Sequence, residues 1–120
     1  MTTIIYHNPR CSKSRQALDL LRERGVEPRI VEYLRTPPDA ATLHELLRML
    51  GCRARDLLRL GEDAYAALGL ASRLDDDDAL VAAMVEHPEL MERPVVVVGA
   101  RAVIGRPPEK VLALLADTTR

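Results

Sequence analysis

The sequence predicts an α/β fold in which a βαβ half and a ββα half enclose a helical segment. Three observations predict it. Strand-type segments at residues 2–7 and 28–34 flank one amphipathic helical pattern. Two more strand-type segments, at 95–99 and 101–105, precede a last helical pattern. The residues between, about 39–92, carry only helical signals, and we find no repeat or linker that would divide the chain into more than one domain, 1–120.

The first half is defined by short local signals. "TTIIYH" is rich in β-branched residues and is broken by Asn8-Pro9. Ala17, Leu18 and Leu21 then share one face of a helix that begins at Ser12 and is followed by a glycine. "PRIVEYL" reads as a second strand. A strand, a helix and a strand in this order favour a parallel pair with a right-handed crossover.

The middle segment and the second half carry similar signals. A helix starts at Asp39 or Thr42 and stops at Gly51. The acidic run 75–78 precedes an apolar-periodic segment, where it complements a helix dipole; a metal site or an acidic partner site is the alternative. "VVVVG" is typical of a buried strand, "RAVIG" completes a hairpin, and "PPEKVLALLADT" begins a helix with proline. The complete order is that of a thioredoxin-like sandwich with a helical insertion between its halves.

Composition excludes several functions. The net charge is −1, and the aromatic residues are three tyrosines with no Trp or Phe, which disfavours nucleic-acid partners. No stretch approaches the roughly 20 apolar residues of a membrane span, and the N-terminus has no secretory pattern. We therefore expect a cytoplasmic protein without a membrane partner, whose two cysteines are free thiols.

Cys11 stands where the first helix begins. The unpaired N–H groups and positive dipole end of a helix N-terminus favour a thiolate, and the same donors favour a bound oxyanion. His7 and Ser14 are close enough in sequence to assist. The alternative is an inert, packed cysteine. Position 14 is serine, so no C-x-x-C dithiol is available, and no other Cys or His stands at ligand spacing for a metal.

Three arginines occupy element ends or loops: Arg59, Arg93 and Arg106. Arginine is planar and always charged, and its forked donors match tetrahedral oxyanions, so these residues are candidates for an anion site next to a thiolate. Surface salt bridging is the alternative for each of them. Cys52 follows Gly51 and reads as packing at a helix end, with a resolving thiol as the alternative.

Five segments in register resemble the bacterial glutaredoxin-coupled arsenate reductase family over essentially the whole chain. They are "YHNPRCSKSR", "YLRTPPDAATL", "DLLR", "HPELMERPVVV" and "IGRPPEKVL". The "HNPRCSKSR" form is most similar to arsenate-reductase-like members of that family.

The resemblance implies an oxidoreductase that reduces arsenate to arsenite through a covalent adduct on Cys11. It implies that His7 and Ser14 help to hold the thiolate, that Asn8 shapes the same loop, and that the three arginines bind the oxyanion. Glutathione would be a co-substrate and glutaredoxin the protein partner, with no bound cofactor or metal. The resemblance also implies a cis Arg93-Pro94 bond that directs Arg93 toward the Cys11 loop.

Two other functions remain open. The first is a related oxidoreductase that acts on another oxyanion or on glutathione mixed disulfides. The second is a non-catalytic, redox-linked transcription regulator that binds RNA polymerase. Regulators of that kind typically carry C-x-x-C at the helix start, and Ser14 replaces the second cysteine here.

Overall fold

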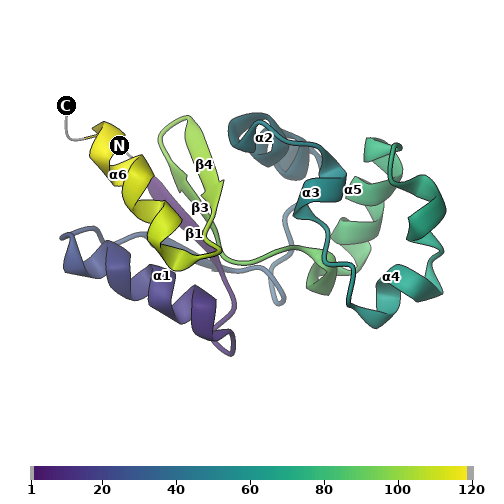
Figure 1. Cartoon of the computed structure of the whole chain (residues 1–120), viewed down its shortest axis with the longest axis horizontal. Helices are drawn as coiled ribbons and strands as arrows, with labels where there is room; N and C mark the ends of the chain where they lie inside the picture. Colours follow the sequence, from purple (N-terminus) through teal and green to yellow (C-terminus); the bar gives the residue numbers. More distant parts are fainter. Residues whose placement is uncertain (1, 119–120) are drawn as a thin grey trace. The chain divides into compact units, whose positions relative to one another are not determined.

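The computed structural model describes residues 2–118, and its elements follow the predicted order (Figure 1). The α/β class and the βαβ, helices, ββα sequence are confirmed. The elements, with η for 3₁₀-helices, are β1 (Thr3–His7), α1 (Ser12–Glu23), β2 (Arg29–Glu32), α2 (Ala40–Leu50), α3 (Ala54–Leu57), α4 (Asp63–Ala67), η1 (Leu70–Arg73), α5 (Asp77–Glu86), η2 (Pro88–Leu90), β3 (Val95–Val98), β4 (Arg101–Ile104), η3 (Pro108–Lys110) and α6 (Val111–Thr118).

The chain forms two compact units. The sheet unit comprises the chain up to Thr36 and from Arg93 onward, and the helical unit is Pro37–Glu92. That the whole chain, 1–120, behaves as a single domain stays a prediction, and residues 1 and 119–120 lie outside the described residues. None of the helices between residues 2 and 118 has the length and apolar character that a membrane crossing requires.

The sheet unit is built on four strands in the order β2-β1-β3-β4. β1 and β2 are parallel, as predicted, with His7 opposite Glu32. β3 is antiparallel to both β1 and β4, so "VVVVG" and "RAVIG" form the predicted hairpin. As a result, the C-terminal ends of β1, β2 and β4 and the N-terminal end of β3 lie at one edge of the sheet. His7, Glu32 and Arg93 come from this edge.

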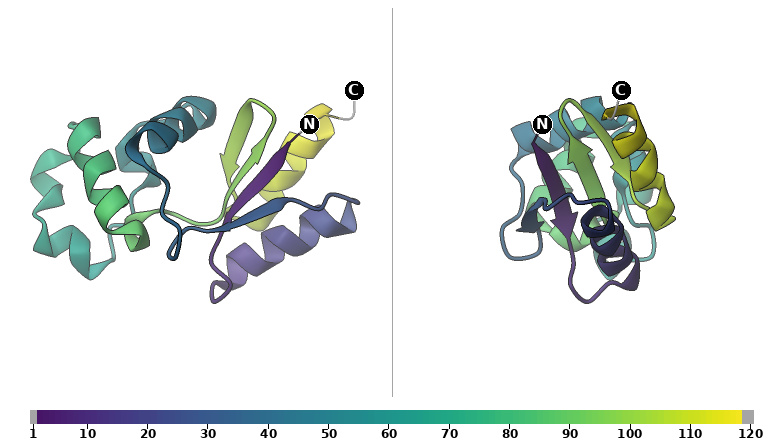
Figure 2. Two further views of the ribbon diagram at one scale, coloured as in Figure 1. Left: turned by 180° about the vertical axis from the view of Figure 1, so that it is seen from behind. Right: turned by 90° about the vertical axis from the view of Figure 1, so that its left-hand side faces the viewer.

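Helices α1 and α6 pack on one face of the sheet (Figure 2). Their apolar stripes meet side chains from β1 and β3 in an aliphatic core made of Ile5, Ala17, Leu18, Leu21, Val96, Val98, Val111, Leu114 and Leu115. All four residues of β3 are buried, as the continuous apolar run predicts. This core holds α1 against β1, and Cys11 lies in the short connection between them, at the start of α1.

Leu21→Ala tests this core. Leu21 is fully buried among residues of α1, α6 and the sheet. We expect the substitution to lower the free energy of unfolding by about 2–5 kcal/mol, because it removes buried methyl groups and leaves a cavity. Urea denaturation measures the loss. Leu20→Ala, on the same helix but only partly buried, is the control and should cost less; equal losses would contradict the packing described.

The helical unit begins with a capped helix. The Asp39 carboxylate accepts from the Thr42 N–H at 2.8 Å, and Gly51 ends α2 in the left-handed region at φ 67°. Both boundaries were predicted. The acidic run behaves as a helix N-terminus, since Asp76 caps α5 and accepts from the Ala79 N–H at 3.1 Å.

The flanking aspartates of this run form ion pairs within the helical unit. Asp77 pairs with Arg53 at 3.0 Å and Asp75 with Arg55 at 3.1 Å. Among residues 2–118, no group of three or more His, Cys, Asp or Glu side chains is arranged to hold a metal ion. The observed roles of the acidic run are therefore helix capping and ion pairing.

Three details differ from the sequence prediction. The second strand ends at Glu32 because the Arg35 and Thr36 N–H groups both bond to the Glu32 carbonyl and close a turn. The helical unit contains a β-bridge between Leu58 and Met91, which helical periodicity gives no means of detecting. The last helix begins at Val111, since its first turn, η3, is a 3₁₀ turn between the prolines and the α-helix.

Candidate functional site

The loop between β1 and α1 is held by its own hydrogen bonds. The Cys11 N–H donates to the Asn8 carbonyl at 3.0 Å, and the Arg10 N–H donates to the Asn8 side-chain oxygen at 3.0 Å. The Arg15 guanidinium reaches back to the Pro9 carbonyl at 2.9 Å. Asn8 thus shapes a tight turn that sets Cys11 at the start of α1.

His7 and Ser14 form a buried pair beneath this loop. A 2.6 Å hydrogen bond joins the His7 Nδ1 to the Ser14 hydroxyl, which also accepts from the Asn8 N–H at 3.1 Å. Both side chains are buried. Burial lowers the pKa of His7, with the Glu32 charge opposing this and the Arg22 and Arg15 charges adding to it, so His7 is neutral at neutral pH. The pair ties the end of β1 to the first turn of α1.

Cys11 is the N-cap of α1 and is partly exposed. Burial raises the pKa of its thiol, but other contacts outweigh this effect. The Ser14 and Lys13 backbone N–H groups and the Arg93 guanidinium lower this pKa, and the Arg93 charge lowers it further. The net result is a pKa below the ordinary cysteine value. The backbone N–H groups at the start of α1 and the Arg93 guanidinium are the causes of this shift.

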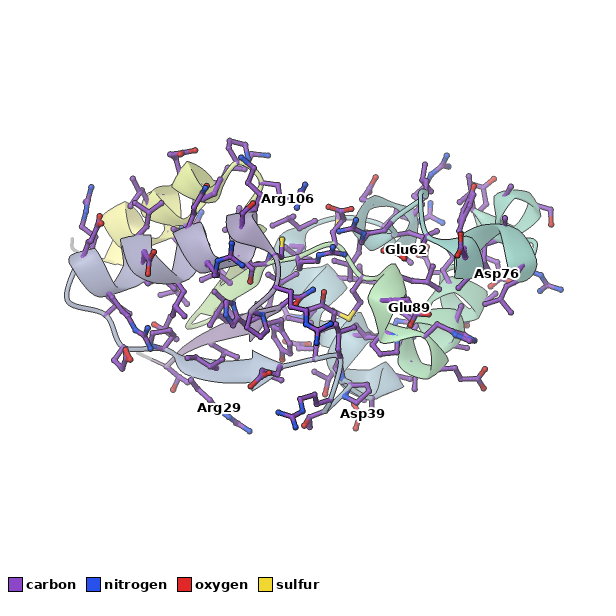
Figure 3. The ribbon with its side chains drawn as sticks, turned by 90° about the horizontal axis from the view of Figure 1, so that it is seen from below. Arg29, Asp39, Glu62, Asp76, Glu89 and Arg106 are labelled. Atoms are coloured by element: carbon purple, nitrogen blue, oxygen red, sulfur yellow. The ribbon has the colours of Figure 1, made fainter. Side chains whose placement is uncertain are left out.

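Arg93 and Arg106 converge on the same sulfur from the other half of the sheet unit. The Arg106 Nη1 donates to the Cys11 sulfur at 3.9 Å and to the Arg93 carbonyl at 3.3 Å. Figure 3 shows Arg106 over the first turn of α1. The Arg93-Pro94 bond is cis, as the family resemblance implied, and Arg106-Pro107 is also cis. Two guanidinium groups thus lie beside the one thiol.

Arg59 belongs to the helical unit. It follows the bridge residue Leu58, its N–H donates to the Leu90 carbonyl at 2.7 Å, and its Nε pairs with Glu62 at 3.3 Å. Its side chain is a quarter exposed. The predicted arginine triad is therefore divided between the two units, and the role of Arg59 stays a prediction.

Six of the seven predicted site residues belong to the sheet unit: His7, Asn8, Cys11, Ser14, Arg93 and Arg106. Ser14 differs in detail from the expectation, because its backbone N–H contacts the sulfur while its hydroxyl is used by His7 and Asn8. The Lys13 N–H is one of the unpaired N–H groups that the sequence places at this helix start. Sequence reasoning missed the contact of the Arg15 guanidinium with the Pro9 carbonyl.

Cys52 has the opposite environment. It lies just after α2 in the helical unit, where its N–H bonds to the Leu47 carbonyl at 3.2 Å. Burial raises the pKa of its thiol, and the Asp56 and Asp77 carboxylates raise it further. Cys52 is therefore a thiol at neutral pH, whereas Cys11 is biased toward the thiolate.

Alkylation by iodoacetamide should separate the two cysteines by pH. The thiolate is the reacting form, so each rate rises with pH about a midpoint at that thiol's pKa. We expect the Cys11 midpoint to lie below, and the Cys52 midpoint above, the ordinary pKa of a cysteine thiol. The alkylation rate of Cys11 is measured in the Cys52→Ser variant and that of Cys52 in the Cys11→Ser variant, so each pH curve belongs to one cysteine. Coincident midpoints would contradict the electrostatics described here.

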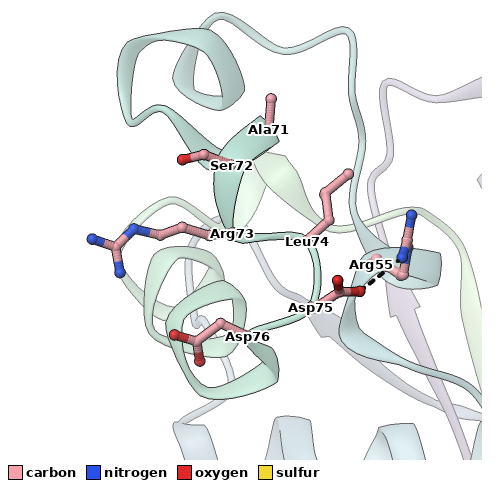
Figure 4. A pocket seen from close by; sticks show the side chains of 7 residues that line it. All are labelled: Arg55, Ala71, Ser72, Arg73, Leu74, Asp75 and Asp76. Atoms are coloured by element: carbon pink, nitrogen blue, oxygen red, sulfur yellow. Dashed lines mark hydrogen bonds and ion pairs between the residues drawn. The ribbon is translucent and has the colours of Figure 1, made fainter.

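The helical unit holds a cavity of about 680 Å³, which is lined by Arg55 and residues 71–76 (Figure 4). None of the predicted site residues lines it. Three of its polar side chains have local partners: Arg55 pairs with Asp75 at 3.1 Å, and the Ser72 hydroxyl donates to the Gly69 carbonyl at 3.0 Å. It contains neither cysteine nor histidine. Cys11 therefore stays the candidate reactive group among the described residues.

Comparison with known proteins identifies the family of the chain. The sequence profile of the ArsC family matches residues 6–114. The chain is 58% identical to the uncharacterized protein YfgD of Escherichia coli K12, over 92% of this chain and 94% of that one. It is 48% identical to an arsenate reductase of Neisseria meningitidis, covering 92% and 96%.

A solved structure extends the agreement to three dimensions. The arsenate reductase from Vibrio cholerae superposes with a TM-score of 0.90 at 47% identity, covering 94% of this chain and 97% of that one. The matched range includes Cys11, both arginines beside it and the loop that holds them. With its thioredoxin-like sheet unit and helical segment, the chain belongs to the ArsC family.

Proposed function

We propose that this protein reduces arsenate to arsenite in the cytoplasm, with glutathione as co-substrate and glutaredoxin as the second reductant. One observation carries the proposal: Cys11 is the N-cap of α1, and the Arg93 and Arg106 guanidinium groups lie beside its sulfur. A thiolate that attacks an oxyanion must approach like charge, and fixed cations beside it lower that barrier. The arsenate reductases among the relatives add support.

In the first step, the Cys11 thiolate attacks the arsenic of dihydrogen arsenate. A sulfur–arsenic bond forms, an arsenic–oxygen bond breaks, and the oxygen leaves as water after taking up a proton. Arg93 and Arg106 bind the arsenate oxygens, and Arg59 is proposed as the third such group. His7, Ser14 and Asn8 keep the loop in the conformation that presents the sulfur.

The electrons come from two external thiols. Glutathione attacks the arsenic of the adduct and displaces a second oxygen as water. The glutaredoxin thiolate then attacks the glutathione sulfur. A disulfide forms between glutaredoxin and glutathione, and the electron pair of the bond between the glutathione sulfur and arsenic stays on arsenic. Arsenic passes from As(V) to As(III), and water releases arsenite from Cys11. Cys11 is the only cysteine in this loop, which fits a cycle whose other thiols come from outside.

A coupled assay tests the proposal. Protein, glutathione, glutaredoxin, glutathione reductase and NADPH are mixed, arsenate starts the reaction, and arsenite is identified as product. We expect arsenate-dependent NADPH oxidation that requires glutaredoxin. An active thiolate that gives no arsenite, but turns over another oxyanion or a glutathione mixed disulfide, would replace this function with the related oxidoreductase. Binding to RNA polymerase without turnover would instead indicate the regulator.

A further inference from the structure

A second cavity borders the loop that precedes Cys11. It measures about 440 Å³, a size typical of small-ligand sites, and is lined by residues 7–10 of the loop together with Glu32, Leu34 and Arg35. All of them belong to the sheet unit. The parallel register of β1 and β2 creates it, because His7 stands opposite Glu32 and both strands end at this edge. Its lining stops one residue short of Cys11.

The sheet order separates this cavity from the arginines at the sulfur. β1 is flanked by β2 on one side and β3 on the other. The cavity lies on the β2 side of the loop, whereas Arg93 precedes β3 and Arg106 follows β4. A molecule in the cavity and an oxyanion beside the two arginines would thus approach Cys11 from different directions, and both sites could be filled together.

The lining selects one kind of ligand. Arg10 and Arg35 offer cations for carboxylates, and Glu32 offers an acceptor for an ammonium group. Leu34, which is 44% exposed, provides apolar surface for a methylene chain. A compact oxyanion would meet the Glu32 carboxylate as a like charge. A small peptide with carboxylates at its ends and one free amine uses every one of these groups.

We propose that this cavity binds the thiol co-substrate, a zwitterionic peptide thiol of the glutathione type, and holds its sulfur toward the arsenic on Cys11. The inference rests on the proposed function, in which an external thiol must reach the adduct while the arginines hold the arsenic oxygens. Arg10 and Arg35 bind its carboxylates and Glu32 binds its ammonium group. They are binding residues and take no part in electron transfer.

Steady-state kinetics with Arg35→Glu tests the site. At saturating glutaredoxin, we expect the KM for glutathione to rise about tenfold, because an attractive charge becomes repulsive, with the KM for arsenate unchanged. Arg10→Glu should act in the same direction. Arg29→Glu is the matched control: Arg29 is an exposed residue of β2, lies outside the lining, and points away from the protein (Figure 3). Equal glutathione KM values in all variants would overturn the site.

A neutral thiol supplies a second comparison. With 2-mercaptoethanol in place of glutathione, Arg35→Glu should equal the wild type, since that thiol has neither carboxylate nor ammonium group. A comparable loss with both thiols would mean that the substitution damages the loop, and would contradict the binding role.

Binding of S-methylglutathione tests the cavity without any turnover. This analogue has no free thiol, so it reports on binding alone even if the protein proves not to reduce arsenate. In ¹H–¹⁵N spectra, we expect saturable shifts at the amides of His7, Asn8, Arg10 and residues 32–36 that Arg35→Glu abolishes and Arg29→Glu retains. Shifts confined to other residues, or no shifts, would overturn the inference. Failure of the coupled assay with these shifts present would remove only the proposed reaction.

Discussion

Cys11→Ser is expected to lower arsenate turnover at least about a thousandfold while leaving the fold intact. The serine hydroxyl is not ionised at neutral pH, so neither the N–H groups of Ser14 and Lys13 nor the Arg93 guanidinium can make it an anionic nucleophile. Cys11 is only partly buried and its replacement removes no core contact, so thermal unfolding should shift little. The coupled assay and a melting curve on the same preparation measure both effects.

Cys52→Ser is the matched control for this experiment. Cys52 is the other free thiol among the described residues, it lies in the helical unit, and its pKa is raised by burial. We expect near wild-type turnover. A large loss of activity without loss of stability would make Cys52 a resolving thiol and replace the external-thiol cycle. Substantial activity in Cys11→Ser would exclude the covalent adduct altogether.

The fold was predictable because its signals are local. The Asn8-Pro9 break, the Asp39 cap and the Gly51 stop each act on neighbouring residues, and each holds in the structure. The apolar character of the four-valine run was enough to predict that it forms a buried strand. The position of Cys11 at the start of α1 followed from the same kind of information.

Convergence of distant residues was not predictable from periodicity. Arg93 and Arg106 meet Cys11 because β3 and β4 are antiparallel neighbours beside β1, a pairing that no local signal specifies. Their candidacy rested on their places at element ends and on a family resemblance. The cavity beside Glu32 and Arg35 depends on the register of two parallel strands, and the role of the Ser14 hydroxyl depends on the position of His7 beneath it.

Arg93→Ala should lower kcat/KM for arsenate about a hundredfold to a thousandfold, because Arg93 acts on two steps at once. In the free enzyme its guanidinium donates to the Cys11 sulfur and lowers that thiol's pKa. In the proposed reaction it also holds an oxygen of the arsenate that the sulfur attacks. Removing it should raise the Cys11 pKa and also weaken substrate binding, and a single rate at one pH would not separate the two losses.

The pH dependence separates them. Below the Cys11 pKa of the variant, two losses reduce the rate: fewer molecules carry the thiolate, and the arsenate lacks its contact with Arg93. Well above it, every molecule carries the thiolate, and the remaining deficit measures the lost oxyanion contact alone. Iodoacetamide alkylation of Arg93→Ala in the Cys52→Ser background gives the pKa independently. Arg93→Lys keeps the charge but not the forked donors, so it should restore more of the pKa than of kcat/KM. A wild-type kcat/KM in Arg93→Ala would remove Arg93 from the anion site, and Arg106, with its Nη1 3.9 Å from the sulfur, would then be the principal cation at Cys11.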